Sequence, residues 1–191
     1  MNDFFLANNR NIAIGDITVH QLQMYDFDEW APHAKVIKDF LKNHSDEIYK
    51  SLFEAHTTDV MIVVSKSTHK SIDELIVVVE ASEIAFIELI DAAIKVNDVF
   101  FSEKEPKRKR GRKKAEEQSS WFDTFQFLID AGHRHDDILQ MSYGTFIGYL
   151  KSAQKQQSDK LRTLTNLMRA ANHANAKAFA KLIEELKPSD D

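Results

Sequence analysis

A block of basic residues divides this 191-residue chain into two parts of different charge. The segment KEPKRKRGRKK, residues 104–114, holds eight Lys or Arg residues and one Glu. Residues 1–103 carry 18 acidic and 8 basic side chains, a net charge of −10, and residues 115–191 carry 11 and 9, a net charge of −2. A block of like charges repels itself and offers little apolar area to bury. We therefore expect a flexible basic linker at 104–118 between an N-terminal domain, 1–103, and a C-terminal domain, 119–191.

The N-terminal domain begins with a pattern of period two and continues with a pattern of period 3.6. Residues 11–23 alternate apolar and polar side chains around Gly15-Asp16, which predicts a small β-hairpin. From Asp28 onward apolar residues recur every three or four positions, as on one face of a helix. A lone hairpin is marginal in water, so it must pack on the helices that follow. The predicted fold class is mainly α, in the α+β sense, with one N-terminal hairpin.

Helix starts in this domain are marked by serine residues. Ser71 and Glu74 have the spacing of a capping box, in which each side chain bonds the other residue's backbone amide. Ser82 is placed to open the longest helix, over residues 83–101. That helix carries two apolar stripes, which is typical of a central element: Ile84, Ile87, Ile90 and Ile94 form one, and Phe86, Leu89, Ala93 and Val96 form the other.

The C-terminal domain is predicted to be entirely helical. A stripe of Phe122, Phe125, Leu128 and Ile129 indicates a first helix, which Gly132 would end as a left-handed cap. Asp136 can cap a short second helix, and Ser142 a third that carries Phe146 inward. The third helix continues through residues 151–164, and an Ala-rich stretch near the C-terminus favours a last helix.

Two stretches of the sequence carry a family resemblance. The N-terminal domain has a hairpin, several short helices and a final helix closing on a VN-x-x-FF-like ending, residues 96–101. The phrase LIDAGHRHDDILQMSYGTFIGYL, within residues 121–150, has a helix, a Gly-His turn, a D-I-x-x-M-S-like segment and an aromatic-bearing helix. Both resemble the tail assembly chaperones of long-tailed bacteriophages, in the order of the N-terminal and frameshift-encoded parts of that family.

The resemblance implies a non-catalytic protein that binds the tape measure protein and recruits tail tube subunits during tail assembly. It also implies a place in the host cytoplasm and absence from the mature virion. In this family a ribosomal frameshift joins the two parts, and Lys113-Lys114-Ala115 could be encoded by an A-rich slippery run. A single fused chain departs from the two-form pattern that is usual for the family.

The basic run allows three interpretations. Arg and Lys around Gly111 can enter a narrow A·T minor groove, although the run lacks the flanking prolines of an AT-hook. A short basic run can also be a nuclear localisation signal. We favour a solvated linker whose charge attracts acidic surfaces. The basic candidates are Lys107, Arg108, Lys109, Arg110, Arg112, Lys113 and Lys114.

Other chemistries have less support in the sequence. His133, His135, Asp136 and Asp137 include metal-ligand types, but neighbours so close in sequence cannot all face one tetrahedral point, so we expect no metal or cofactor. Residues 136–151 resemble a helix-turn-helix, which makes a DNA-binding regulator the alternative function, yet DNA affinity needs several cations and this domain is acidic. No P-loop, GxGxxG, HExxH or GxSxG motif is present, and we expect no enzyme activity.

The C-terminal domain is dense in aromatic residues, and a domain of this size cannot bury them all. Phe122, Phe125 and Phe146 fit the inward stripe and are expected to be structural. Exposed aromatic residues are enriched at interface hot spots. The remaining ones are therefore candidate partner-binding residues: Trp121, Phe127, Tyr143 and Tyr149.

The sequence also narrows the cellular setting. The chain has no cysteine, which excludes disulfides, cysteine-ligated metals and cysteine nucleophiles and is compatible with a reducing cytoplasm. No apolar run approaches the length of a membrane span, so no membrane partner is expected. The first ten residues, MNDFFLANNR, lack the basic and apolar regions of a secretory signal, and we expect none.

Overall fold

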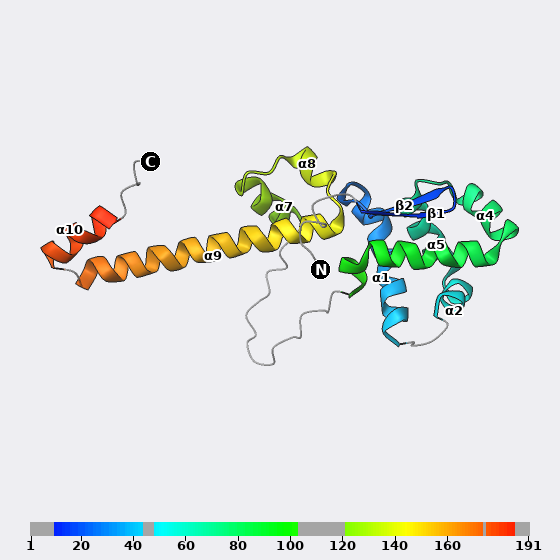
Figure 1. Ribbon diagram of the computed structural model, residues 1–191, viewed down its shortest axis with the longest axis horizontal. Coiled ribbons are helices and arrows are strands. Elements are labelled where there is room, and N and C mark those ends of the chain that lie inside the picture. The colour runs from blue at the N-terminus through cyan, green and yellow to red at the C-terminus, as the bar shows by residue number, and fades with distance from the viewer. Residues whose placement is uncertain (1–9, 44–47, 103–120, 174, 186–191) are drawn as a thin grey trace. The chain divides into compact units, whose positions relative to one another are not determined.

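The computed structural model describes residues 10–43, 48–102, 121–173 and 175–185. It is mainly helical with a two-stranded antiparallel sheet near the N-terminus (Figure 1), which confirms the predicted fold class. Contacts between Cα atoms divide the chain into two units, Met1–Leu150 and Lys151–Asp191. The division falls within helix α9 (Tyr143–His173). The linker predicted at 104–118 lies outside the described residues.

The sheet is the predicted hairpin. Strands β1 (Asn11–Ile14) and β2 (Ile17–His20) pair antiparallel, with Ile14 opposite Ile17 across a two-residue turn. Gly15 has φ +55° at the first turn position, a conformation that glycine adopts without steric cost. Val19 is fully buried, so one face of the hairpin packs on the helices, as its marginal stability requires.

The first unit builds its core around helix α5 (Glu83–Val96). Both strands and the helices α2, α3, α4 and α6 contact α5, and Phe86 and Leu89 are buried on it. The other elements up to residue 102 are the 3-10 helix η2 (Met24–Asp26), α1 (Phe27–Asn43), α2 (Ile48–Ala55), α3 (Thr57–Thr68), α4 (Ile72–Ala81) and α6 (Asp98–Ser102).

Both predicted serine caps are confirmed. Ser71 Oγ accepts a hydrogen bond from Glu74 N at 3.2 Å, and Glu74 Oε2 accepts one from Ser71 N at 2.8 Å, which completes the capping box of α4. The Ser82 hydroxyl accepts from Ala85 N at 3.2 Å and caps α5. These bonds satisfy amides that have no partner within their own helix.

The long helix predicted over 83–101 is wrong in its extent, because it ends at Val96 and α6 follows as a separate turn. Asn97 causes the break. Its side-chain oxygen accepts from Leu22 N at 2.7 Å, while its amide nitrogen donates to the carbonyl of Ala93 at 2.9 Å. A buried amide with both ends bonded ties α5 to the segment that follows the hairpin.

Helices α7 (Trp121–Asp130), α8 (His135–Leu139) and the start of α9 complete the first unit. Two backbone bonds join this segment to the end of the hairpin segment: Met24 N donates to Met141 O at 2.9 Å, and Tyr143 N to Leu22 O at 3.0 Å. Backbone hydrogen bonds therefore join two segments that are far apart in the sequence.

The turns of this segment confirm two predictions and correct one. Gly132 has φ +101°, as its predicted role at the helix end requires. Ser142 Oγ accepts from Thr145 N at 3.3 Å at the start of α9. The predicted Asp136 cap is wrong, because α8 already begins at His135 and its N-cap residue is Arg134.

The second unit consists of α9 from Lys151 onward and α10 (Ala176–Glu185). None of its described side chains is buried. Across the described part of the whole chain, no helix is both long and apolar enough to cross a membrane.

Candidate protein-binding surface

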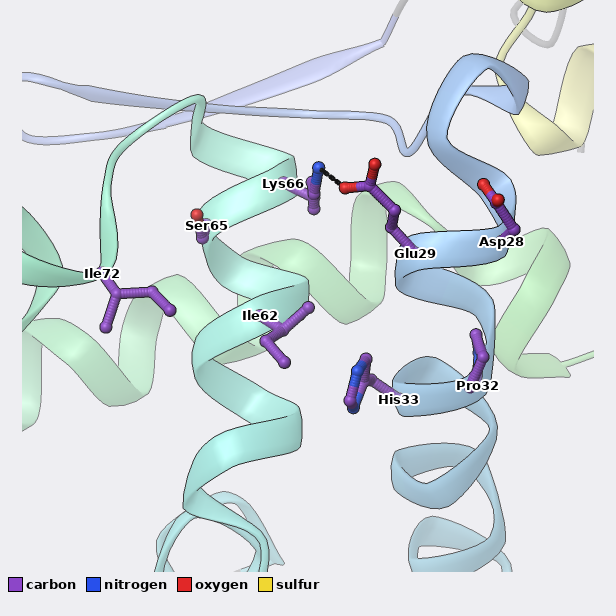
Figure 2. A pocket seen from close by; sticks show the side chains of 8 residues that line it. All are labelled: Asp28, Glu29, Pro32, His33, Ile62, Ser65, Lys66 and Ile72. Carbon is purple, nitrogen blue, oxygen red and sulfur yellow. Dashed lines mark hydrogen bonds and ion pairs between the residues drawn. The ribbon is translucent and has the colours of Figure 1, made fainter.

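A groove of about 480 Å³ lies between α1 and α3 in the first unit. Figure 2 shows α1 on one side, α3 on the other and the first residue of α4 at the margin. Ile62 and His33 point toward one another across it. The lining residues are Asp28, Glu29, Pro32, His33, Ile62, Ser65, Lys66 and Ile72.

Ion pairs hold the two walls of the groove together. Lys66 Nζ on α3 lies 2.5 Å from Glu29 Oε2 on α1 and 3.1 Å from Asp26 Oδ2. The hydrogen bond to Glu29, followed by that to Asp26, raises the pKa of Lys66 despite partial desolvation. Nearby, His33 Nδ1 lies 2.7 Å from Asp59 Oδ1. The groove therefore has braced walls, which suits it to receive a ligand without large rearrangement.

Four polar side chains of the groove, those of Glu29, His33, Ser65 and Lys66, bond to other protein groups. Ser65 Oγ donates to the Lys70 carbonyl at 2.6 Å, so the hydroxyl is directed to the backbone and not to His33. A nucleophile needs a base within hydrogen-bond reach, and Ser65 and His33 each bond elsewhere. The groove is better suited to binding than to covalent chemistry.

Helix α4 exposes an apolar surface beside the groove. Seven of its ten residues are apolar, yet only Leu75 is fully buried. The side chains of Ile72, Ile76 and Val77, which we call the α4 surface, are 46%, 43% and 63% exposed. A surface helix usually buries its apolar side chains in one stripe, and an exposed apolar patch outside that stripe marks a candidate interaction site. Ile72 belongs to both the groove and the α4 surface, so the two are continuous.

Acidic side chains border this continuous surface. Asp73 and Glu80 on α4 and Asp28 on α1 are exposed. Glu74 has a cation nearby, since its carboxylate lies 3.3 Å from Lys70 Nζ, and hydrogen bonds from Ser71, then Lys70, lower its pKa. An apolar strip with an acidic border complements a helix that has an apolar face and basic flanks.

The structure corrects the placement of Tyr143, which we expected to be exposed. Its side chain is 9% exposed, and its ring lies against Phe27, Trp30 and Phe100 at centroid distances of 5.9, 6.0 and 5.1 Å. Tyr143 is therefore a core residue that packs the start of α9 against α1 and α6. The spacing along α9 could not reveal this, because Tyr143 and Tyr149 each lie three residues from the inward Phe146 and only one of them is buried.

The other three predicted aromatic candidates lie at or near the surface. Trp121 is 48% exposed, although its ring contacts Phe27 at 4.4 Å. Tyr149 is 40% exposed and lies 4.7 Å from the ring of His133. Phe127 is half-buried. Phe122, which we expected to point inward, is 76% exposed because α7 buries the face that carries Leu128.

The remaining candidates are the basic run, the histidine and aspartate cluster and the helix-turn-helix-like segment. Lys107, Arg108, Lys109, Arg110, Arg112, Lys113 and Lys114 all lie outside the described residues. Within the described ranges, no group of three His, Cys, Asp or Glu side chains could hold a metal ion. In a helix-turn-helix the start of the second helix reads the bases. Tyr143 and Gly144, at the corresponding start of α9, are buried, which disfavours that arrangement.

Comparison of the chain with protein-family models, curated proteins and solved structures found no match. Sequence reasoning missed the candidate surface, because it considered the start of this helix only for the capping box of Ser71 and Glu74. The available signal was the composition of residues 72–81, IDELIVVVEA, in which seven of ten side chains are apolar, more than the one buried stripe of a surface helix needs.

Proposed function

We propose that this chain is a non-catalytic tail assembly chaperone of a long-tailed phage, and that the α4 surface with the adjoining groove holds apolar helical segments of the tape measure protein. The observation that carries the proposal is the exposed apolar strip formed by Ile72, Ile76 and Val77. A tape measure protein in solution exposes apolar helical faces intended for the tail interior, and such faces aggregate. A helix-in-groove contact covers them.

The same proposal gives the C-terminal part of the chain the task of recruiting tail tube subunits. Trp121 and Tyr149 are its exposed aromatic candidates, and both are supported by neighbouring rings that limit their side-chain freedom. A large side chain that is already ordered loses little entropy on binding. The work takes place in the host cytoplasm, and the chaperone leaves before the virion is complete.

Co-expression of this chain with the tape measure protein of the same phage tests the proposal. The soluble fraction of the tape measure protein should rise several-fold, and the two should purify together. Ile76→Asp should remove most of that gain, because a carboxylate then enters the apolar strip. Ile129→Asp is the matched control, since Ile129 is a helical isoleucine of similar exposure, 36% against 43%, on α7.

Two outcomes would overturn the proposal. One is a tape measure protein that stays insoluble and does not purify with the wild-type chain. The other is duplex DNA binding in a gel-shift assay that weakens steeply with salt and is lost when the basic run 107–114 is neutralised, which a DNA-binding regulator predicts.

A further inference from the structure

Helix α9 carries an exposed apolar stripe in the second unit. Leu161, Leu164 and Met168 are 59%, 53% and 68% exposed. No described side chain between residues 151 and 181 is buried, so the described part of that unit leaves the stripe uncovered. Three large apolar side chains in a row along one helix indicate a partner surface rather than scattered surface residues.

The stripe follows the spacing of a coiled coil. Alternating steps of three and four residues run through Gln154, Gln157, Leu161, Leu164, Met168 and Ala171, and all six side chains are exposed. This is the seam spacing of a heptad repeat, in which the two seam positions face the partner helix. Charged residues lie off the seam: Lys155, Asp159, Lys160, Arg162 and Arg169. The pattern is therefore a two-sided one, with a seam of glutamine and apolar residues and a charged outer face.

We infer that this seam binds a second copy of the chain, with the two α9 helices parallel and in register. The glutamine pair selects this occupant and this register. In the in-register parallel dimer, Gln154 faces Gln154 of the second copy, Gln157 faces its equivalent, and each pair of amides can exchange hydrogen bonds. A shift of one heptad places Gln154 and Gln157 against Leu161 and Leu164, which buries amides without partners.

The flanking positions also accept a second copy. In a parallel pair, the residue before each first seam position faces the residue five positions further along the other helix, which comes directly after the next second seam position. Here those cross-pairs are Ala153 with Ser158, Lys160 with Thr165, and Leu167 with Asn172. No pair brings like charges together, so nothing at the edge of the seam opposes self-association.

The dimer should be weak and concentration-dependent. The seam is short, and two of its six layers are polar, which costs stability while it fixes register. We expect a dissociation constant on the order of 10–100 μM. Such a dimer would form where many copies gather and separate on dilution.

Sedimentation velocity of the full chain, from about 1 μM to about 1 mM, should show monomer converting to dimer. Gln157→Glu places two carboxylates face to face and should weaken the dimer by at least about tenfold. Gln156→Glu makes the same change on the outer face and should leave it unaltered. The side chains of Gln156 and Gln157 are both exposed, so both variants should keep the helix content of the wild-type chain, as measured by circular dichroism.

Register is tested by a single introduced cysteine, because the chain has no cysteine of its own. Gln157→Cys should give a disulfide-linked dimer on mild oxidation, since facing seam positions meet the geometry of a disulfide. Gln156→Cys should not. A chain that stays monomeric over the whole concentration range would overturn the inference, as would equal weakening by Glu at 156 and 157. Crosslinking at 156 as efficient as at 157 would contradict the parallel register.

Discussion

Single residues decide which aromatic side chains stabilise the first unit and which remain available to partners. Tyr143 and Tyr149 lie six residues apart on α9, yet one is 9% exposed and the other 40%. The helical period does not separate them, because each lies three residues from the fully buried Phe146. The neighbours do: the Tyr143 ring lies against the rings of Phe27, Trp30 and Phe100, whereas Tyr149 lies beside the ring of His133. Residue type and spacing suggested the same role for both, and only the contacts that the fold supplies separate them.

Truncation of the two tyrosines should give opposite results. Tyr143→Ala removes a ring packed on Phe27, Trp30 and Phe100, and should lower the free energy of unfolding by about 3 kcal/mol. Tyr149→Ala should change it by less than about 1 kcal/mol. Urea unfolding followed by the fluorescence of Trp30 and Trp121 measures both, since the two rings lie in or beside the affected cluster. Equal losses in the two variants would place Tyr149 in the core as well.

At the scale of helices and strands, the sequence could predict those elements that depend on neighbouring residues. The hairpin rests on Gly15 and alternating side chains, and the helix starts at Ser71 and Ser82 rest on short-range bonds. Each lies within a few residues of its cause. The break at Asn97 depends on Leu22, 75 residues away, so no local pattern could reveal it. The backbone hydrogen bond between Met24 and Met141 also joins residues that are far apart in the sequence.

The contact between β2 and α3 should respond to pH. His20 on β2 lies 5.1 Å, ring to ring, from His69, which follows the end of α3. Burial, and then the charge of His69, lower the pKa of His20 below its usual value. The unfolded chain therefore takes up a proton on His20 at a higher pH than the folded chain does. Stability from this site is complete above about pH 6.5 and falls as the pH drops through that range.

Thermal unfolding between about pH 7.5 and about pH 5.5 measures this effect. His20→Gln should reduce the loss of melting temperature on acidification, because the residue that resists protonation is gone. His69→Asn should reduce it by a smaller amount, since burial is the larger cause and remains. Asparagine also tolerates the φ of +55° at residue 69. If His20→Gln loses as much melting temperature on acidification as the wild type does, the contact between His20 and His69 does not cause the pH response.

At the scale of the whole molecule, two kinds of exposed apolar surface are candidates for two kinds of partner. The α4 surface has an acidic border, which suits a foreign helix with basic flanks, whereas the α9 seam has glutamine layers that suit a second copy. The sequence patterns predicted a mainly helical fold with more aromatic residues than the C-terminal domain can bury, but could not place these surfaces. Exposure of an apolar residue depends on which neighbours the fold supplies, as Leu75 and Val77 on one helix show with 0% and 63%.

Hydrogen–deuterium exchange of the full chain, alone and with a solubilised helical segment of the tape measure protein, tests the proposed binding surface most directly. Binding at the α4 surface should slow amide exchange in residues 72–81 and in the groove walls of α1 and α3, because a docked helix excludes water and suppresses local opening. The Ile76→Asp variant should lose that protection. Protection confined to other elements, or no protection at saturating partner, would contradict the account.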